Sequence, residues 1–249
     1  MERDIMNQEK QHAHYEWVIL IILFFSQVIL SMGTYAWGPL GPYIKESLML
    51  TPVQIGSLTS TIYLSAVVCS IPAGISVDRW GVRLNLFICM MLMGIAMIVA
   101  SFINNYSGLI ILLVFAGASY GMINPLASKG LAVWFDIRLR ATAFGIRQMG
   151  VTAGGAIAGL HLIYLAQLKN WNFAVLVVGL SALVAGALGV VFYKEPPDKN
   201  IPESVSKKTS PQKMGLIDLI KNRNLLLISL IMTFLCLARA VLPPFWCCI

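Results

Sequence analysis

The sequence predicts an all-α, polytopic membrane protein, built as a bundle of long apolar helices. Hydrophobic residues make up 58% of the 249 residues and charged residues only 12%, whereas soluble domains contain about 25% charged residues. A transmembrane helix needs about 20 apolar residues, and seven runs of about that length follow one another along the chain. This composition argues against a soluble enzyme, a nucleic-acid-binding module and a disordered protein.

The predicted spans form six closely spaced helices and one that stands apart. The runs cover residues 17–40, 53–73, 84–103, 108–134, 142–166, 171–193 and 225–246. The first run is too long for a cleavable signal peptide, so we expect it to remain as a span. We therefore expect a cytoplasmic N-terminus (1–16), a six-helix bundle (17–193), a cytoplasmic linker (194–224) and a seventh segment with a truncated tail (225–249). Four prolines among many charges make 194–224 typical of a flexible linker.

Lys and Arg are distributed unequally between alternate connections. Thirteen of the 18 fall on the side of the N-terminus and two on the other side, while Lys129, Arg147 and Arg239 lie inside spans. Cytoplasmic loops are enriched in Lys and Arg, so the N-terminus is predicted to be cytoplasmic. We expect a multi-pass protein of the cell inner (plasma) membrane, surrounded by the lipid bilayer.

A charged turn between the second and third spans contains the most specific motif. Residues 74–83 read GISVDRWGVR, which resembles the signature loop of the major facilitator superfamily, G-x-x-x-D-R-x-G-[RK]-[RK]. The five positions that match are Gly74, Asp78, Arg79, Gly81 and Arg83, and Val82 departs from the pattern. Glycines permit a sharp turn, and such a charge cluster can lock one of two bundle arrangements. We predict that these five residues gate a conformational change; the alternative is an ordinary basic cytoplasmic turn.

The resemblance to this family extends over residues 15–195. Residues 37–42 with 51–56 are similar to its first outer loop, and residues 124–125 and 134–145 are similar to its loop between spans 4 and 5. The start of span 5, residues 145–150, resembles bacterial organic-anion and cyanate-type members. The resemblance implies one half of a twelve-helix fold, two inverted three-helix repeats with substrate held between the halves. Span 4 lacks an early Arg and residues 150–155 lack Pro, which disfavours drug/proton antiport.

Polar residues inside the spans are the candidate substrate contacts. An ionisable group there costs about 2.5–3.5 kcal/mol on insertion scales and usually faces a cavity. Arg147, with Lys129 at similar depth, could attract an anion; alternatively, both snorkel to the interface. Neutral groups could contact substrate or only bond neighbouring helices. The predicted substrate-binding residues are Gln27, Ser31 and Tyr35, which form a stripe along span 1, with Tyr120, Asn124 and Arg147.

Small residues in span 5 predict close helix packing. Gly150, Gly154 and Ala158 recur at every fourth residue, a spacing that lets two helix backbones approach closely. Span 1 is one candidate for the helix packed there.

Together these features favour a secondary active transporter of a small solute, an organic anion, that works by alternating access as a symporter with a proton or other ion. The alternative is a non-transporting truncated product or membrane helper subunit, because the chain ends soon after Pro243-Pro244. A partner would then supply the missing C-terminal half. No catalytic or metal-ligand motif is recognisable, so we expect no enzyme activity, no cofactor, no metal and no nucleic-acid partner.

Overall fold

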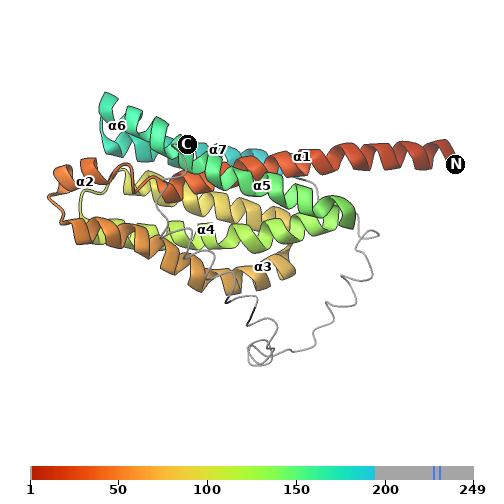
Figure 1. The fold of residues 1–249 in the computed structure, drawn as a ribbon, viewed down its shortest axis with the longest axis horizontal. Helices are drawn as coiled ribbons and strands as arrows, with labels where there is room; N and C mark the ends of the chain where they lie inside the picture. Colours follow the sequence, from red (N-terminus) through yellow and green to blue (C-terminus); the bar gives the residue numbers. More distant parts are fainter. Residues whose placement is uncertain (1, 194–226, 228–229, 231–249) are drawn as a thin grey trace. The chain divides into compact units, whose positions relative to one another are not determined.

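The computed structural model describes residues 2–193 together with 227 and 230, and side chains from residue 15 onward. Over these residues the chain forms helices and short connections, without a strand (Figure 1). The predicted all-α bundle is thereby confirmed. The predicted linker and seventh segment lie outside the described residues, apart from helical backbone at 227 and 230. The helices are α1 (Glu2–Tyr35), α2 (Gly41–Leu48), α3 (Pro52–Ala100), α4 (Tyr106–Trp134), α5 (Ile137–Ile157), a π-helical turn (Ala158–Leu162), α6 (Ile163–Leu168) and α7 (Trp171–Phe192).

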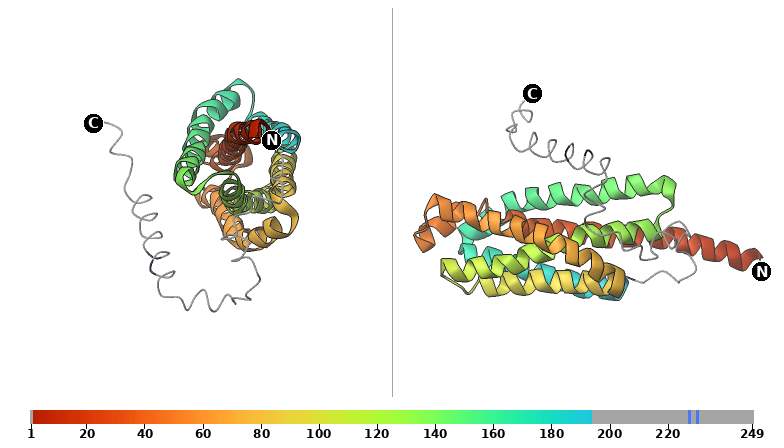
Figure 2. Two further views of the ribbon diagram at one scale, coloured as in Figure 1. Left: turned by 90° about the vertical axis from the view of Figure 1, so that its right-hand side faces the viewer. Right: turned by 90° about the horizontal axis from the view of Figure 1, so that it is seen from below.

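The element α3 contains two of the predicted spans. It is 49 residues long, and its helical geometry is interrupted at Gly81, where φ is 78° and ψ is 174°. A positive φ of this kind strongly favours glycine. The chain reverses at this point, so the two parts of α3 run in opposite directions (Figures 1 and 2). The described residues contain five helical segments that are long and apolar enough to cross a membrane, and one of them, α3, includes two of the predicted spans on either side of Gly81.

Local sequence signals determine where the helices begin. Thr51 and Gln54 form a reciprocal capping box at the start of α3, with Pro52 in the first turn. The side chain of Asn105 caps α4 by accepting a hydrogen bond from the Gly108 amide, 2.6 Å away. Such caps satisfy backbone N–H groups that have no partner within the helix.

The helices pack in two main sets of contacts. The two parts of α3 pack against α4 and α7, while α1 packs against α5 and α7. In the end-on view of Figure 2, α1 lies between α5 and α7. An added Cβ at Gly150 would lie 3.0 Å from the Phe24 carbonyl oxygen, and one at Gly154 would lie 2.7 Å from the Ser31 Cβ. The predicted close packing of this glycine face is therefore correct, and its partner is α1.

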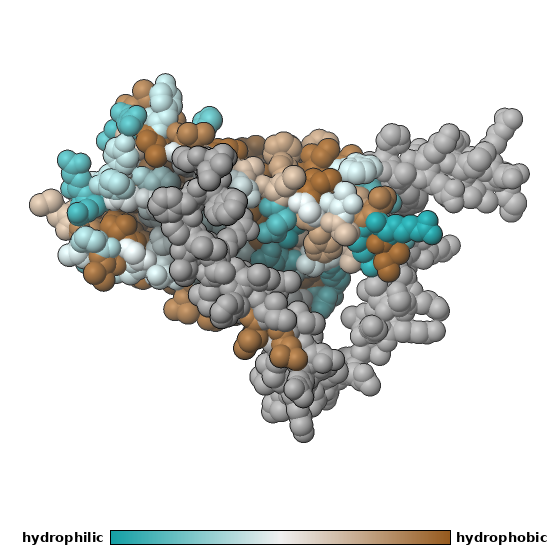
Figure 3. Space-filling model, in the orientation of Figure 1, coloured by the Kyte–Doolittle hydropathy of each residue, from teal (hydrophilic) through white to brown (hydrophobic). Residues whose placement is uncertain are grey.

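Different connections between helices form the two ends of the bundle. One end carries the Gly81 turn and the connection between α4 and α5, and the other carries α2 and the connections at 101–105 and 169–170 (Figure 1). Hydrophilic residues gather near both ends of the face drawn in Figure 3. Many large apolar side chains are exposed along the flanks, among them Leu64, Val67 and Ile71. Exposed apolar flanks between polar ends suit a bilayer, because lipid tails replace water around the helices.

We predict that Gly154→Ala destabilises the bundle. Its new Cβ would overlap the α1 backbone at Val28 and the Ser31 side chain. Overpacking of this kind costs about 1–3 kcal/mol, which corresponds to several degrees in Tm in a thermal unfolding experiment on detergent-solubilised protein. Gly145→Ala on the same helix is the matched control, since nothing lies within 4 Å of its added Cβ. An equal Tm for the two variants would contradict the close contact.

Candidate functional site

Arg147 joins three helices at the centre of the candidate site. Its side chain extends from α5 and is only 4% exposed. The Nη2 group donates hydrogen bonds to the Gln27 side-chain oxygen on α1 and to Oδ1 of Asn124 on α4, the latter at 2.9 Å. The buried Nε has no hydrogen-bond partner among the described residues. The arginine is therefore buried but only partly satisfied.

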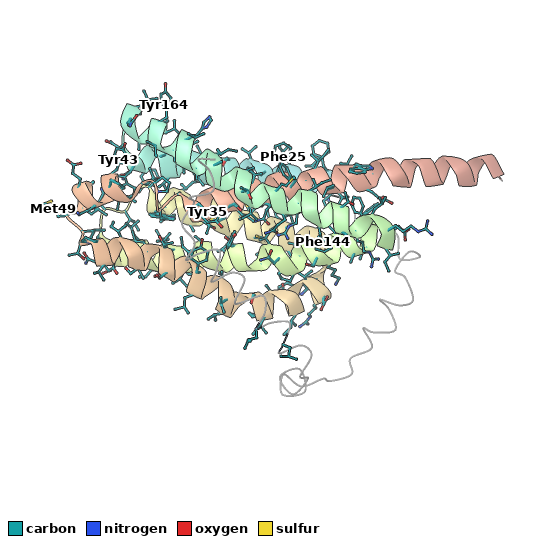
Figure 4. The ribbon with its side chains drawn as sticks, in the orientation of Figure 1. Phe25, Tyr35, Tyr43, Met49, Phe144 and Tyr164 are labelled. Carbon is teal, nitrogen blue, oxygen red and sulfur yellow. The ribbon has the colours of Figure 1, made fainter. Side chains whose placement is uncertain are left out.

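Hydroxyl groups continue this network along α1. Nε2 of Gln27 donates to the Ser31 hydroxyl at 3.0 Å. The Tyr120 side chain on α4 lies near the side chains of Ser31 and Tyr35 and within electrostatic range of Arg147. Figure 4 shows Tyr35 midway along the bundle. The structure thus brings all six predicted substrate-binding residues into one cluster, which we call the Arg147 cluster.

Tyr63, a polar residue inside the second predicted span, belongs to the same cluster. Its side chain lies near those of Tyr35 and Tyr120. Tyr63 is the only phenol in the second predicted span.

The cluster is buried at one side and open at the other. Gln27, Ser31 and Arg147 are buried, Tyr35 and Tyr120 are half-buried, and Tyr63 is 40% exposed. Asn124 is also exposed. A solute could therefore approach the aromatic hydroxyls from the side of α3 and α4 without displacing a helix. Two cavities among the described residues, one lined by Lys169 and the other by Arg83, lie away from this cluster, towards the ends of the bundle.

The electrostatics of the cluster favour an anion. Within the described part of the chain, no carboxylate forms an ion pair with Arg147, whose recorded partners are neutral amides. A buried cation without an opposite charge is costly, and a carboxylate is the group that a guanidinium binds most strongly through paired hydrogen bonds. The arrangement can thus hold one small anion between α1, α4 and α5.

Lys129 does not join Arg147 as the sequence had suggested. Its Nζ lies 3.0 Å from Oδ1 of Asp78 and 3.0 Å from the Val77 carbonyl oxygen. Of the two interpretations of Lys129, the cationic lining shared with Arg147 is not what the structure shows, because the signature turn offers Lys129 a carboxylate. Lys129 instead connects the end of α4 to that turn.

The signature turn contains four further predicted residues. Gly81 adopts the positive φ described above, and Gly74 lies on α3 with its nearest neighbour, Pro125 of α4, 4.0 Å from an added Cβ. Arg79 is exposed at the end of the bundle. Nε of Arg83 donates to the Val190 carbonyl oxygen of α7 at 3.0 Å. With Asp78 bonded to Lys129, the turn is tied to both α4 and α7.

Asn85 holds the turn together and was missed by sequence reasoning. It is fully buried. Its Nδ2 donates to the carbonyl oxygens of Gly81 and Ser76, at 2.7 and 3.1 Å, and its Oδ1 accepts from the Ser76 hydroxyl. Asn85 lies two residues beyond the signature motif. The one indication of it in the sequence is a single polar residue at the start of an apolar run.

The family follows from the comparison with known proteins. The Major Facilitator Superfamily profile matches residues 23–245, most of the chain. The chain belongs to the major facilitator superfamily. Members of this family are transporters and not enzymes, in agreement with the sequence prediction, and the chain is a multi-pass membrane protein.

Curated relatives match the chain over about half of their own length. A hexuronate transporter of Bacillus subtilis is 25% identical over 211 residues, which is 84% of this chain and 50% of that protein. A probable sulfoacetate transporter of Cupriavidus necator is 25% identical, covering 78% of this chain and 45% of that protein. A 4-hydroxybenzoate transporter of Acinetobacter baylyi is 22% identical, covering 74% and 40%.

Solved structures show the same fold. A bacterial homologue of the human lysosomal transporter Spinster, inward-facing and unoccupied, superposes with a TM-score of 0.65 at 20% identity. The match covers 74% of this chain and 44% of that one. Its occupied inward-facing form gives a TM-score of 0.67 at 18% identity, covering 74% and 45%.

We predict that Gly81→Ala loosens the signature turn. A side chain in this backbone conformation costs about 1–3 kcal/mol, so the turn should open more often. Limited trypsin digestion of the detergent-solubilised protein should then cleave faster after Arg79, which is exposed. Gly74→Ala is the control within the same motif, because its nearest neighbour would lie at 4.0 Å. If trypsin cleaves Gly81→Ala after Arg79 at the wild-type rate, the turn does not need glycine at position 81.

Proposed function

We propose that this chain forms one half of a secondary active transporter for small organic anions. The observation that supports it most directly is the buried Arg147, which has no carboxylate partner among the described residues and lies among hydrogen-bonding groups. The relatives add support, since hexuronate, sulfoacetate and 4-hydroxybenzoate, after which they are named, are all small anions.

In this proposal the Arg147 cluster is the contribution of this half to the substrate site. The guanidinium binds the carboxylate or sulfonate, and Gln27 and Asn124 orient it. The phenols of Tyr35, Tyr63 and Tyr120 contact the remainder of the solute from the open side. Alternating access then requires a second half-bundle that moves against this one. We propose that the turn at 74–83, tied to α4 and α7 by Asp78 and Arg83, controls that movement.

Symport follows from the electrical work of moving an anion. Uptake into a cell whose interior is negative opposes an anion by about 2.3 kcal/mol per charge per 100 mV. A coupled cation such as a proton removes this opposition. We therefore propose cation symport in the plasma membrane, with the N-terminus in the cytoplasm. A non-transporting helper subunit is the less favoured alternative, because the named relatives are transporters.

The orientation can be tested with two single cysteines in a cysteine-free background. Trp80, in the signature turn, and Ser107, at the start of α4, lie near opposite ends of the bundle and are both exposed. In intact cells, a membrane-impermeant maleimide should label Ser107→Cys and not Trp80→Cys, which should react only after the cells are opened. The reverse pattern would overturn the cytoplasmic assignment of the turn.

The substrate proposal can be tested by binding to the purified 249-residue chain in lipid nanodiscs. Radiolabelled glucuronate, sulfoacetate and 4-hydroxybenzoate should be screened, and at least one should bind saturably. Arg147→Gln should weaken that binding about ten-fold or more, because a charged hydrogen bond is lost. Arg147→Lys should rescue it only partly, since an ammonium cannot reproduce the planar fork.

The matched control is Lys169→Gln, which removes a cation at the opposite end of the bundle and should leave binding unchanged. Liposome uptake by the same chain gives a second measurement. We expect no saturable uptake from this chain alone, because the opposing wall of the site is needed for alternating access. Binding by no anion of the panel, or equal binding by wild type and Arg147→Gln, would contradict the proposed site.

A further inference from the structure

A small crevice lies between α3 and α7, on the outside of the bundle near the signature turn. Its volume is about 380 Å³, and it is lined by Arg83, Leu84, Phe87 and Val190. Three of these side chains are apolar and one is a permanent cation. The crevice is separate from the Arg147 cluster, none of whose residues line it.

The arginine at this crevice is fixed in position but retains free donors. Nε of Arg83 donates to the Val190 carbonyl oxygen at 3.0 Å, which holds the guanidinium across the junction of α3 and α7. A guanidinium has five N–H donors, so this bond leaves others for an anion. Arg83 is also exposed, and an anion can therefore reach it without a rearrangement of the helices.

The surroundings of the crevice are those of a lipid-facing surface. Leu84 is 47% exposed, and Leu188 and Val191 of the facing helix are 51% and 67% exposed. In a bilayer such side chains contact acyl chains. Arg83 comes directly after the Gly81 turn that joins the two apolar parts of α3, so we expect its charge to lie at the depth of lipid head groups.

We propose that this crevice binds an anionic phospholipid, with its phosphate at Arg83 and an acyl chain against Leu84, Phe87 and Val190. A soluble anion would satisfy the arginine and leave the apolar walls uncovered, whereas a neutral lipid would fill the walls and leave the charge unpaired. An amphiphile with a negative head group satisfies both parts. Basic pockets between transmembrane helices on the cytoplasmic side are suited to such lipids.

The proposal has a structural consequence for the neighbouring turn. Arg83 belongs to the signature turn, whose other side is held by the bond between Asp78 and Lys129. A lipid bridging Arg83 and α7 would reinforce the link between the turn and α7. The lipid site does not depend on which solute the protein transports, because no residue of the Arg147 cluster takes part.

The test is native mass spectrometry of the purified chain mixed with phosphatidylglycerol or phosphatidylcholine of identical acyl chains. We expect phosphatidylglycerol to be retained about five-fold more than phosphatidylcholine, the preference that one basic residue near a membrane surface provides. Arg83→Gln should abolish this preference. Arg138→Gln, which removes an exposed arginine at the same end of the bundle, should preserve it.

Two further experiments distinguish a bound lipid from a soluble anion. Leu84→Trp, which leaves Arg83 in place and fills the crevice, should reduce retention of phosphatidylglycerol. Glycerol phosphate, the soluble head group, should not displace the lipid. Equal retention of the two lipids, equal losses in Arg83→Gln and Arg138→Gln, or displacement by glycerol phosphate would overturn the proposal. A thermal unfolding curve for each variant identifies any loss that comes from misfolding.

Discussion

The close approach of α1 and α5 is the constraint on which the candidate site depends. Gly150 and Gly154 allow the α5 backbone to lie against α1, so that an added Cβ would meet Phe24 or Val28 and Ser31. Arg147 lies one turn before Gly150 on the same face, and Gln27 and Ser31 lie on the facing side of α1. The distance between the helix axes therefore sets whether a short amide can reach the guanidinium. A larger residue at either glycine would separate the charge from the groups that stabilise it.

The buried arginine and the half-buried lysine show two ways of accommodating a cation in an apolar bundle. Lys129 has a carboxylate, Asp78, at 3.0 Å, and both side chains remain partly exposed. Its charge is therefore neutralised within the protein and screened by solvent. Among the described residues, Arg147 has only amide oxygens as hydrogen-bond acceptors, and it is almost fully buried. Of the two cations, Arg147 is thus the one that gains from an incoming anion, and Lys129 is suited to holding the turn.

Much of the fold could be predicted because a bilayer leaves few choices. Long apolar runs must form helices, since no water is present to satisfy exposed backbone groups. The position of the α3 reversal could be predicted from Gly81 and its charged neighbours. The stripe of Gln27, Ser31 and Tyr35 could also be predicted, because it depends on the helical repeat alone. Which helix this stripe faces could only be suggested, since the spacing of glycines indicates a close contact without naming the partner.

The residues that sequence reasoning missed are those whose roles depend on contacts between helices. Asn85 has no helical repeat to mark it, yet its three hydrogen bonds close the reversal at Gly81. The sequence predicts that Lys129 and Arg147 lie at similar depth in their spans. The turn of α3, however, places Asp78 within 3.0 Å of Lys129. The same turn also carries Arg83, which holds α7. A single reversal therefore fixes the ends of three helices, and a change in its geometry would reach α4 through Lys129 and, along α4, Asn124 beside Arg147.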